Sequence, residues 1–239
     1  MRMRSRQPVA LVTGGAVRLG RTLCAALVAG GYRVVIHCHR SQGAAARLAR
    51  RLNGGMDQAR VCCVDLSLAG APARLVTEAQ SCYGQLDVLI NNAAVFDGLP
   101  LTGTPEAALR RELEINFMAP LLLVKAFAEQ LKRGRIINIL DTRIARPAAE
   151  PFVYALAKKA LAAATRMAAL ELAPNIFVNA VAPGPVLPPV RGAHREPAGR
   201  LPLGRRPKPV DVAQAVMALL AMNSTTGQIV YVDAGRHLV

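Results

Sequence analysis

The chain has 239 residues, 52% of them hydrophobic, which is enough to bury the core of one sizeable domain. Its formal net charge of +15 would suit a polyanionic partner, but the basic residues are dispersed, only 4% of residues are aromatic and none is tryptophan. Because nucleic-acid sites combine a basic groove with stacking aromatic residues, we expect no nucleic-acid partner.

Targeting and cysteine patterns indicate a cytoplasmic protein without a membrane partner. Arg2, Arg4 and Arg6 resemble the start of a signal peptide, but the apolar run after them is too short, and no run reaches a membrane-spanning length. The five cysteines are odd in number and form no Cys-x-x-Cys pair. We therefore expect buried, reduced thiols and no metal site.

The first expected element is a strand ending at Val12, followed by a glycine-rich turn and a helix over residues 18–30. Gly14, Gly15 and Gly20 let the backbone approach a ligand closely, and the N-terminus of the helix suits a pyrophosphate group. Turns of this kind also occur where they only reverse the chain, so the pattern alone leaves both interpretations open.

The same cycle of strand and helix repeats along the chain. Six more apolar runs predict strands at residues 34–36, 61–64, 88–90, 135–140, 176–181 and 228–232. Helical periodicity is found at residues 42–52, 68–83, 105–131 (with a break near 115–119) and 152–172. This alternation predicts an α/β fold: a single Rossmann-type, doubly wound domain over residues 1–239, with a seven-stranded, mainly parallel sheet and helices on both faces.

Residues 183–209 lack periodicity and are rich in proline, glycine and arginine. In a doubly wound sheet, ligands bind beyond the carboxyl ends of the strands, and long loops there are commonly functional. We therefore expect a substrate loop over residues 183–209, in which His194 is exposed rather than catalytic.

The end of the second strand indicates which dinucleotide would bind. No acidic residue precedes Asp57, so the carboxylate that would bind a ribose 2′-hydroxyl is missing, whereas Arg40 and Ser41 can bind a 2′-phosphate. NADP is therefore favoured over NAD, although Arg40 would also fit as an exposed start to the next helix. Asp65 can accept from the adenine amino group or cap the following helix.

Tyr154 and Lys158 stand four residues apart on a predicted helix, and so share one face. An ammonium group near a phenol lowers the pKa of the phenol, which would make Tyr154 a proton donor near neutral pH. Asn116 and the Asn91-Asn92-Ala93 segment lie at the same predicted edge of the sheet. These residues together indicate an active site.

Several motifs together resemble the short-chain dehydrogenase/reductase family over the whole chain: Thr13-Gly14-x-x-x-Arg18-x-Gly20, Asn91-Asn92-Ala93, Asn116, Tyr154-x-x-x-Lys158, Pro183-Gly184 and Val232-Asp233-Ala234-Gly235. Two departures from the usual family pattern are similar to its pteridine reductase branch. Arg18 replaces a glycine, and Asp141 stands where most members have a serine. The branch also has counterparts of His37, His39, Arg40, Ser41 and the aromatic Phe96.

This resemblance implies NADPH-dependent reduction of a dihydropterin, and of dihydrofolate as a further substrate, to the tetrahydro form. The hydride would go to a ring carbon and the proton to a ring nitrogen, for which a carboxyl group at Asp141 is suited. Tyr154 and Lys158 would complete the proton path, and Asn116 would support the helix or a water molecule. Asp141 would otherwise cap its turn or pair with Arg143 or Arg146.

The resemblance also assigns the binding residues. The cofactor-binding residues would be Gly14, Arg18, Leu19, Gly20, His39, Arg40, Ser41, Asp65, Leu66, Asn92, Ala93, Lys158, Pro183 and Gly184. The substrate-binding residues would be Arg18, Phe96, Asp141, Tyr154 and Leu187, with the pterin between Phe96 and the nicotinamide. The family further implies a homotetramer built on the long helices.

Some residues differ from the pteridine reductase pattern. Ala94 and Val95 replace serines, which removes an expected hydroxyl contact, and nothing in the sequence explains why Ala234 replaces a glycine. Two alternatives remain open: a general carbonyl or 3-oxoacyl reductase of the same family, and a non-catalytic, NADP(H)-responsive binding protein.

Overall fold

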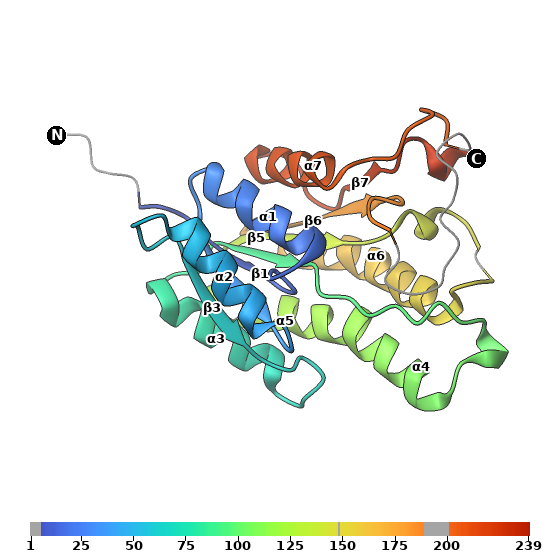
Figure 1. Ribbon diagram of the computed structural model, residues 1–239, viewed down its shortest axis with the longest axis horizontal. Helices are drawn as coiled ribbons and strands as arrows, with labels where there is room; N and C mark the ends of the chain where they lie inside the picture. The colour runs from blue at the N-terminus through green and yellow to red at the C-terminus, as the bar shows by residue number, and fades with distance from the viewer. Residues whose placement is uncertain (1–5, 148, 189–200) are drawn as a thin grey trace.

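The computed structural model describes residues 6–147, 149–188 and 201–239 and contains one seven-stranded sheet in the order β3-β2-β1-β4-β5-β6-β7 (Figure 1). All six neighbouring pairs are parallel, as expected for strands joined by helical crossovers. The strands are β1 (Val9–Val12), β2 (Arg33–Cys38), β3 (Ala59–Cys63), β4 (Val88–Asn91), β5 (Gly134–Ile139), β6 (Ile176–Pro183) and β7 (Ile229–Val232).

Helices cover both faces of this sheet (Figure 1). The α-helices are α1 (Arg18–Ala29), α2 (Gln42–Asn53), α3 (Ala71–Tyr83), α4 (Glu106–Leu113), α5 (Ala119–Leu131), α6 (Phe152–Leu172) and α7 (Pro209–Ala221). Short helical turns are η1 (Leu101–Gly103), η2 (Glu114–Met118), η3 (Thr142–Ala145) and η5 (Arg236–Leu238).

Two apolar cores explain why the central strands are hydrophobic at every position. In β1, Ala10 and Val12 pack into the core under α1, α2 and α7, whereas Val9 and Leu11 pack into the core under α3 and α5. Successive side chains of a strand point to opposite faces, so a sheet covered on both faces needs apolar residues throughout. The predicted doubly wound α/β fold is confirmed.

The helices confirm the prediction at one point and differ from it at two. The expected break in residues 105–131 is the π-helical turn η2 between α4 and α5, which confirms the interruption. Helix α3 begins at Ala71 rather than residue 68, because Gly70 before it adopts a positive φ of 74°. Helix α7 was not predicted; Asp211 accepts the Lys208 N–H at 2.7 Å and so closes its first turn.

The prediction of buried thiols is wrong for two cysteines. Cys24, Cys38 and Cys62 are buried, but Cys63 is exposed and Cys82 is half-buried. Cys63 is exposed because it ends β3, the strand at one edge of the sheet. Part of the expected substrate loop, including His194, lies outside the described residues.

Among the helices that the structure describes, none has both the length and the apolar character that a membrane crossing requires.

Candidate active site

A hydroxyl group joins the carboxyl ends of the two central strands. The Thr13 Oγ1, just after β1, accepts the backbone N–H groups of Asn92 and Ala93 after β4, at 2.9 and 3.0 Å. The Asn92 side chain in turn donates to the carbonyl oxygens of Thr13 and Gly14, at 2.8 and 3.2 Å. These bonds fix the glycine-rich turn against the segment that follows β4.

Two glycines of the glycine-rich turn occupy positions where a side chain would be strained or would collide with the backbone. Gly14 has a positive φ of 60°, and a Cβ atom added at Gly20 would lie 2.1 Å from the Gly14 carbonyl oxygen. Helix α1 follows Val17, whose apolar side chain cannot cap the free N–H groups of the first turn. The turn therefore has the backbone shape and the helix dipole that bind a pyrophosphate group.

His37 supports the same turn, although sequence reasoning did not place it among the site residues. Its buried ring has Nε2 2.9 Å from the Val64 carbonyl oxygen, so Nε2 must donate, and Nδ1 accepts the Gly14 N–H at 3.1 Å. Burial lowers the pKa of His37, which favours the neutral ring that this pair of bonds requires.

The predicted adenosine-binding residues lie together beyond β2 and β3. His39 Nε2 is 3.4 Å from the Asp65 carboxylate, Arg40 is exposed, and Ser41 directly precedes α2. Asp65 accepts the backbone N–H and the hydroxyl of Ser67, which lowers the pKa of its carboxyl. Asp65 therefore closes a turn ahead of α3 instead of capping the helix itself.

Asp141 has both of the arrangements considered from the sequence. Its carboxylate lies 3.3 Å from the Tyr154 hydroxyl, which donates to it. It also caps η3 by accepting the Arg143 N–H at 2.9 Å, and it pairs with the Arg143 guanidinium at 3.0 Å. The carboxylate thus connects a buried phenol to a half-buried cation.

The expectation that Lys158 lowers the pKa of Tyr154 is wrong for this structure. The Tyr154 pKa is raised well above its usual value, first by burial and then by the charge of Asp141. Lys158 is buried, its Nζ donates to the Ile139 carbonyl oxygen at 2.7 Å, and burial lowers its pKa to about 8. Tyr154 consequently remains protonated at neutral pH and can donate.

Phe96 and Asn116 complete the predicted catalytic side of the site. The Phe96 ring meets the Tyr154 ring edge-to-face, with centroids 5.0 Å apart, and it is 45% exposed. Asn116, buried in η2, accepts the Val95 N–H at 3.1 Å and donates to the Val95 carbonyl oxygen at 2.9 Å. In this structure Asn116 therefore anchors the loop that carries Phe96.

The remaining predicted residues line the same edge of the sheet. Arg18 has a φ of 51° and donates to the Pro188 carbonyl oxygen at 2.8 Å, so it contacts the expected substrate loop. Leu19, in the first turn of α1, packs against the apolar core, and Leu66 is buried after β3. Pro183 ends β6, and Leu187 is half-buried beyond it.

Asp233 is a buried carboxylate that sequence reasoning matched only as part of a motif. It accepts the Thr142 hydroxyl at 2.5 Å and the His237 N–H at 2.8 Å, and so ties the C-terminal turn to the residue after Asp141. A Cβ atom at Gly184 would lie 2.7 Å from the Asp233 Cβ, which explains the glycine there.

The Gly20 contact gives a test of the turn. We expect Gly20→Ala to lower the free energy of unfolding by about 3 kcal/mol, because the new methyl group must displace backbone atoms. Gly43→Ala, within α2 and without a close backbone contact, is the control and should leave stability unchanged or slightly raised. Urea unfolding of both variants measures the difference; equal stability would contradict the close packing at Gly20.

Comparisons with known proteins agree with this geometry. Residues 8–198 match the family model described as short chain dehydrogenase. A relative from Streptomyces violaceoruber whose name assigns it to ketoacyl reduction in granaticin polyketide synthase is 34% identical, over 97% of both chains. Pteridine reductase 1 of Leishmania tarentolae is 33% identical, over 97% of this chain and 96% of that one.

A solved structure extends the likeness to three dimensions. The FolM alternative dihydrofolate reductase 1 from Brucella suis, in complex with NADP, superposes with a TM-score of 0.91 at 34% identity, and the match covers 99% of this chain and 97% of that one. With a family model that covers most of the chain and full-length relatives above 30% identity, the protein belongs to the short-chain dehydrogenase/reductase family.

Proposed function

We propose that this protein is an NADPH-dependent reductase that converts a dihydropterin, and also dihydrofolate, to the tetrahydro form. The observation that carries the proposal is the Asp141 carboxylate at hydrogen-bond distance from the Tyr154 hydroxyl, beside an exposed Phe96 ring. Support comes from relatives named as a pteridine reductase and an alternative dihydrofolate reductase.

The cofactor end of the site fits NADPH. The uncapped start of α1 and the backbone space at Gly20 suit the pyrophosphate, and Arg40 with Ser41 suits a 2′-phosphate. The protein in the Brucella suis structure is bound to NADP. When bound, NADPH supplies the hydride that reaches the ring carbon.

The chain's own residues supply and direct the proton. A C=N bond is reduced by hydride at carbon and protonation at nitrogen, and a carboxyl group can deliver that proton. Tyr154 donates its hydroxyl hydrogen to the Asp141 carboxylate. This contact supports a path in which the phenol supplies a proton to the carboxyl, which passes it to the ring nitrogen, and solvent then restores the phenol. Lys158, whose Nζ donates to the Ile139 carbonyl oxygen, would hold the cofactor ribose beside this path.

The substrate side is built for a flat ring. Phe96 is exposed enough for its ring to stack on a substrate, and the Arg143 guanidinium lies over that ring, 5.8 Å from its centroid. Arg18, held against Pro188, would bridge the cofactor phosphate and the pterin, with Leu187 in the substrate loop over residues 183–209.

A carbonyl or 3-oxoacyl reductase is the second candidate. The relative named for ketoacyl reduction matches this chain as closely as the pteridine reductase does. Such an enzyme must polarise a carbonyl oxygen, for which Tyr154 is suited. The carboxyl oxygens of Asp141 would repel the negative charge that develops on a carbonyl oxygen, whereas a ring nitrogen gains a proton during reduction, which favours the pterin.

Substrate preference separates the two candidates. We expect NADPH oxidation with dihydrobiopterin, dihydromonapterin or dihydrofolate, and little with a panel of ketones. Asp141→Ser should lower pterin turnover by about 100-fold, because it removes the proton-delivering group. Turnover of ketones alone by the unmodified protein would favour the carbonyl reductase.

The Lys158 pKa predicts a pH limit. Because the free protein loses the Lys158 charge above about pH 8, we expect kcat/KM to fall as the pH rises through that value and to be constant below it. The Lys158→Arg variant keeps its charge at this pH, so its kcat/KM should not fall there even if the variant is less active. A wild-type profile that stays flat to about pH 10 would show that the Lys158 charge is not required.

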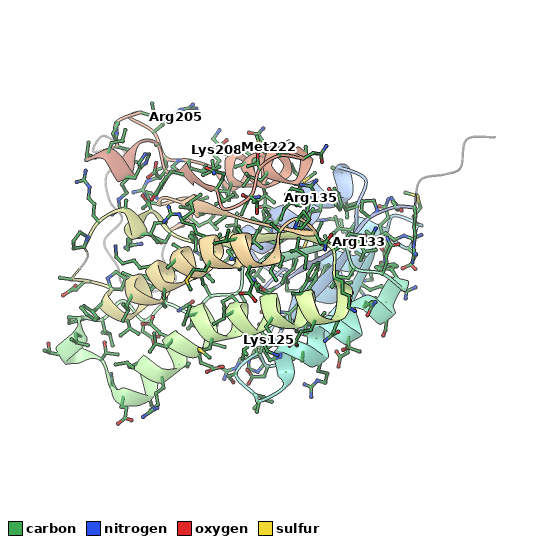
Figure 2. The ribbon with its side chains drawn as sticks, turned by 180° about the vertical axis from the view of Figure 1, so that it is seen from behind. Lys125, Arg133, Arg135, Arg205, Lys208 and Met222 are labelled. Carbon is green, nitrogen blue, oxygen red and sulfur yellow. The ribbon has the colours of Figure 1, made fainter. Side chains whose placement is uncertain are left out.

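We also propose a cytoplasmic homotetramer built on α5 and α6, which run side by side on the face seen in Figure 2. Both helices expose apolar residues: Leu122 on α5 is 36% exposed, and Met167 and Leu170 on α6 are 70% and 84% exposed.

Light scattering after size-exclusion chromatography tests this assembly. We expect a mass corresponding to a tetramer, and a smaller species for Leu170→Glu, because a charge cannot be buried at that contact without a partner. Glu171→Gln, on the same helix, is a control for surface substitution. A monomeric wild-type protein would contradict the proposal.

A further inference from the structure

The loop that carries Phe96 is held on both sides of that residue by the α4–η2 segment. Asn116 bonds the N–H and the carbonyl of Val95, the residue before Phe96. The Glu112 carboxylate accepts the N–H of Asp97, the residue after Phe96, at 2.8 Å. The two anchoring side chains stand four residues apart, so Phe96 is bracketed by groups from adjacent helical turns.

Glu112 also contacts the catalytic helix. The backbone N–H of Tyr154 lies in the first turn of α6, where it has no partner within the helix, and its interaction with Glu112 lowers the pKa of that carboxyl. The neighbouring Phe152 N–H donates to the Leu99 carbonyl oxygen at 3.1 Å, so the loop and the start of α6 are joined at two points. One carboxylate therefore connects the backbone beside Phe96 to the backbone of Tyr154.

The burial of Glu112 shows that this contact differs from an ordinary surface charge. Glu112 is only 2% exposed, and burial raises the pKa of its carboxyl, whereas the hydrogen bond from the Asp97 N–H opposes that shift. The exposed Arg111 guanidinium pairs with Asp97 at 2.6 Å, but solvent screens such a pair. Of these two contacts between α4 and the loop, the one made by the buried Glu112 carboxylate is therefore the less screened by solvent.

We propose that Glu112 is a positioning residue that sets the distance between Phe96 and Tyr154, and so the width of the slot that admits a flat substrate ring. The role in substrate binding rests on the proposed function, because it takes Phe96 as the stacking surface. Glu112 would act on the substrate only indirectly, through the backbone of Asp97 next to Phe96 and through the start of α6 at Tyr154.

Three variants separate positioning from general stability. Glu112→Ala leaves two backbone donors without an acceptor, whereas Glu112→Gln keeps a carbonyl oxygen in the same place. Glu106→Gln is the matched control, since Glu106 lies on the same helix but is exposed and pairs only with Arg110 among the described residues.

Hydrogen–deuterium exchange tests the contact without any substrate. We expect faster exchange in Glu112→Ala for peptides covering residues 95–99 and the start of α6, with unchanged exchange at the glycine-rich turn. Glu112→Gln should exchange more slowly than Glu112→Ala, and Glu106→Gln should match the wild type. Unchanged exchange in Glu112→Ala would overturn the inference.

Kinetics then tests the consequence. Glu112→Ala should raise the KM for the dihydropterin about tenfold, with the Kd for NADPH unchanged and KM largely restored in Glu112→Gln. An unchanged KM, or a parallel loss of NADPH binding, would overturn the positioning role. If the wild-type protein reduces no pterin, the proposed function fails by itself, and the exchange experiment still decides whether Glu112 fixes the loop.

Discussion

The Thr13 hydroxyl, which accepts two backbone N–H groups from the segment after β4, is the contact on which the site depends. It holds the carboxyl ends of β1 and β4 next to each other. The glycine-rich turn and the loop toward Phe96 therefore begin at adjacent positions on the sheet. In a parallel sheet, this is the edge where side chains from separate strands can act on one ligand. In the proposed function, the N-terminus of α1 would bind the pyrophosphate of the cofactor, and the loop that carries Phe96 would contact the substrate ring.

In the part of the site proposed to bind the substrate ring, two side chains contact the carboxylate of Asp141. Its carboxylate is shared between the Tyr154 hydroxyl and the Arg143 guanidinium. Arg143 also lies over the Phe96 ring, so the residues that would bind the substrate ring and those that would protonate it form one contact group. A serine at this position could donate a hydrogen bond to a carbonyl oxygen, but it could not replace the carboxylate as a proton carrier between phenol and nitrogen.

Sequence patterns predicted the parts of the structure that depend on local chemistry. The strands were predicted because both faces of the sheet are covered, which makes runs such as Val9–Val12 continuously apolar. The helical spacing of Tyr154 and Lys158 predicted that they share one helix face. The absence of acidic residues before Asp57 indicated Arg40 as a residue that can bind a 2′-phosphate.

Other features depend on contacts between distant segments. Glu112 and Asp233 bind backbone N–H groups. Because almost every residue has such a group, the amino-acid type of the partner does not indicate the bond. The raised pKa of Tyr154 follows from burial, which spacing alone does not predict. Helix α7 is so apolar, with Val212, Val216 and Leu220 all buried, that its pattern does not distinguish a helix from a buried strand.

In the proposed reaction, a carboxyl group at Asp141 faces a ring nitrogen of the substrate. A crystal structure of the ternary complex with NADP⁺ and a pterin tests this arrangement. We expect the pterin ring to stack on Phe96 with a ring nitrogen at hydrogen-bond distance from the Asp141 carboxyl. A pterin bound away from Phe96, or one whose ring nitrogens face only the Tyr154 hydroxyl while Asp141 stays paired with Arg143, would contradict it.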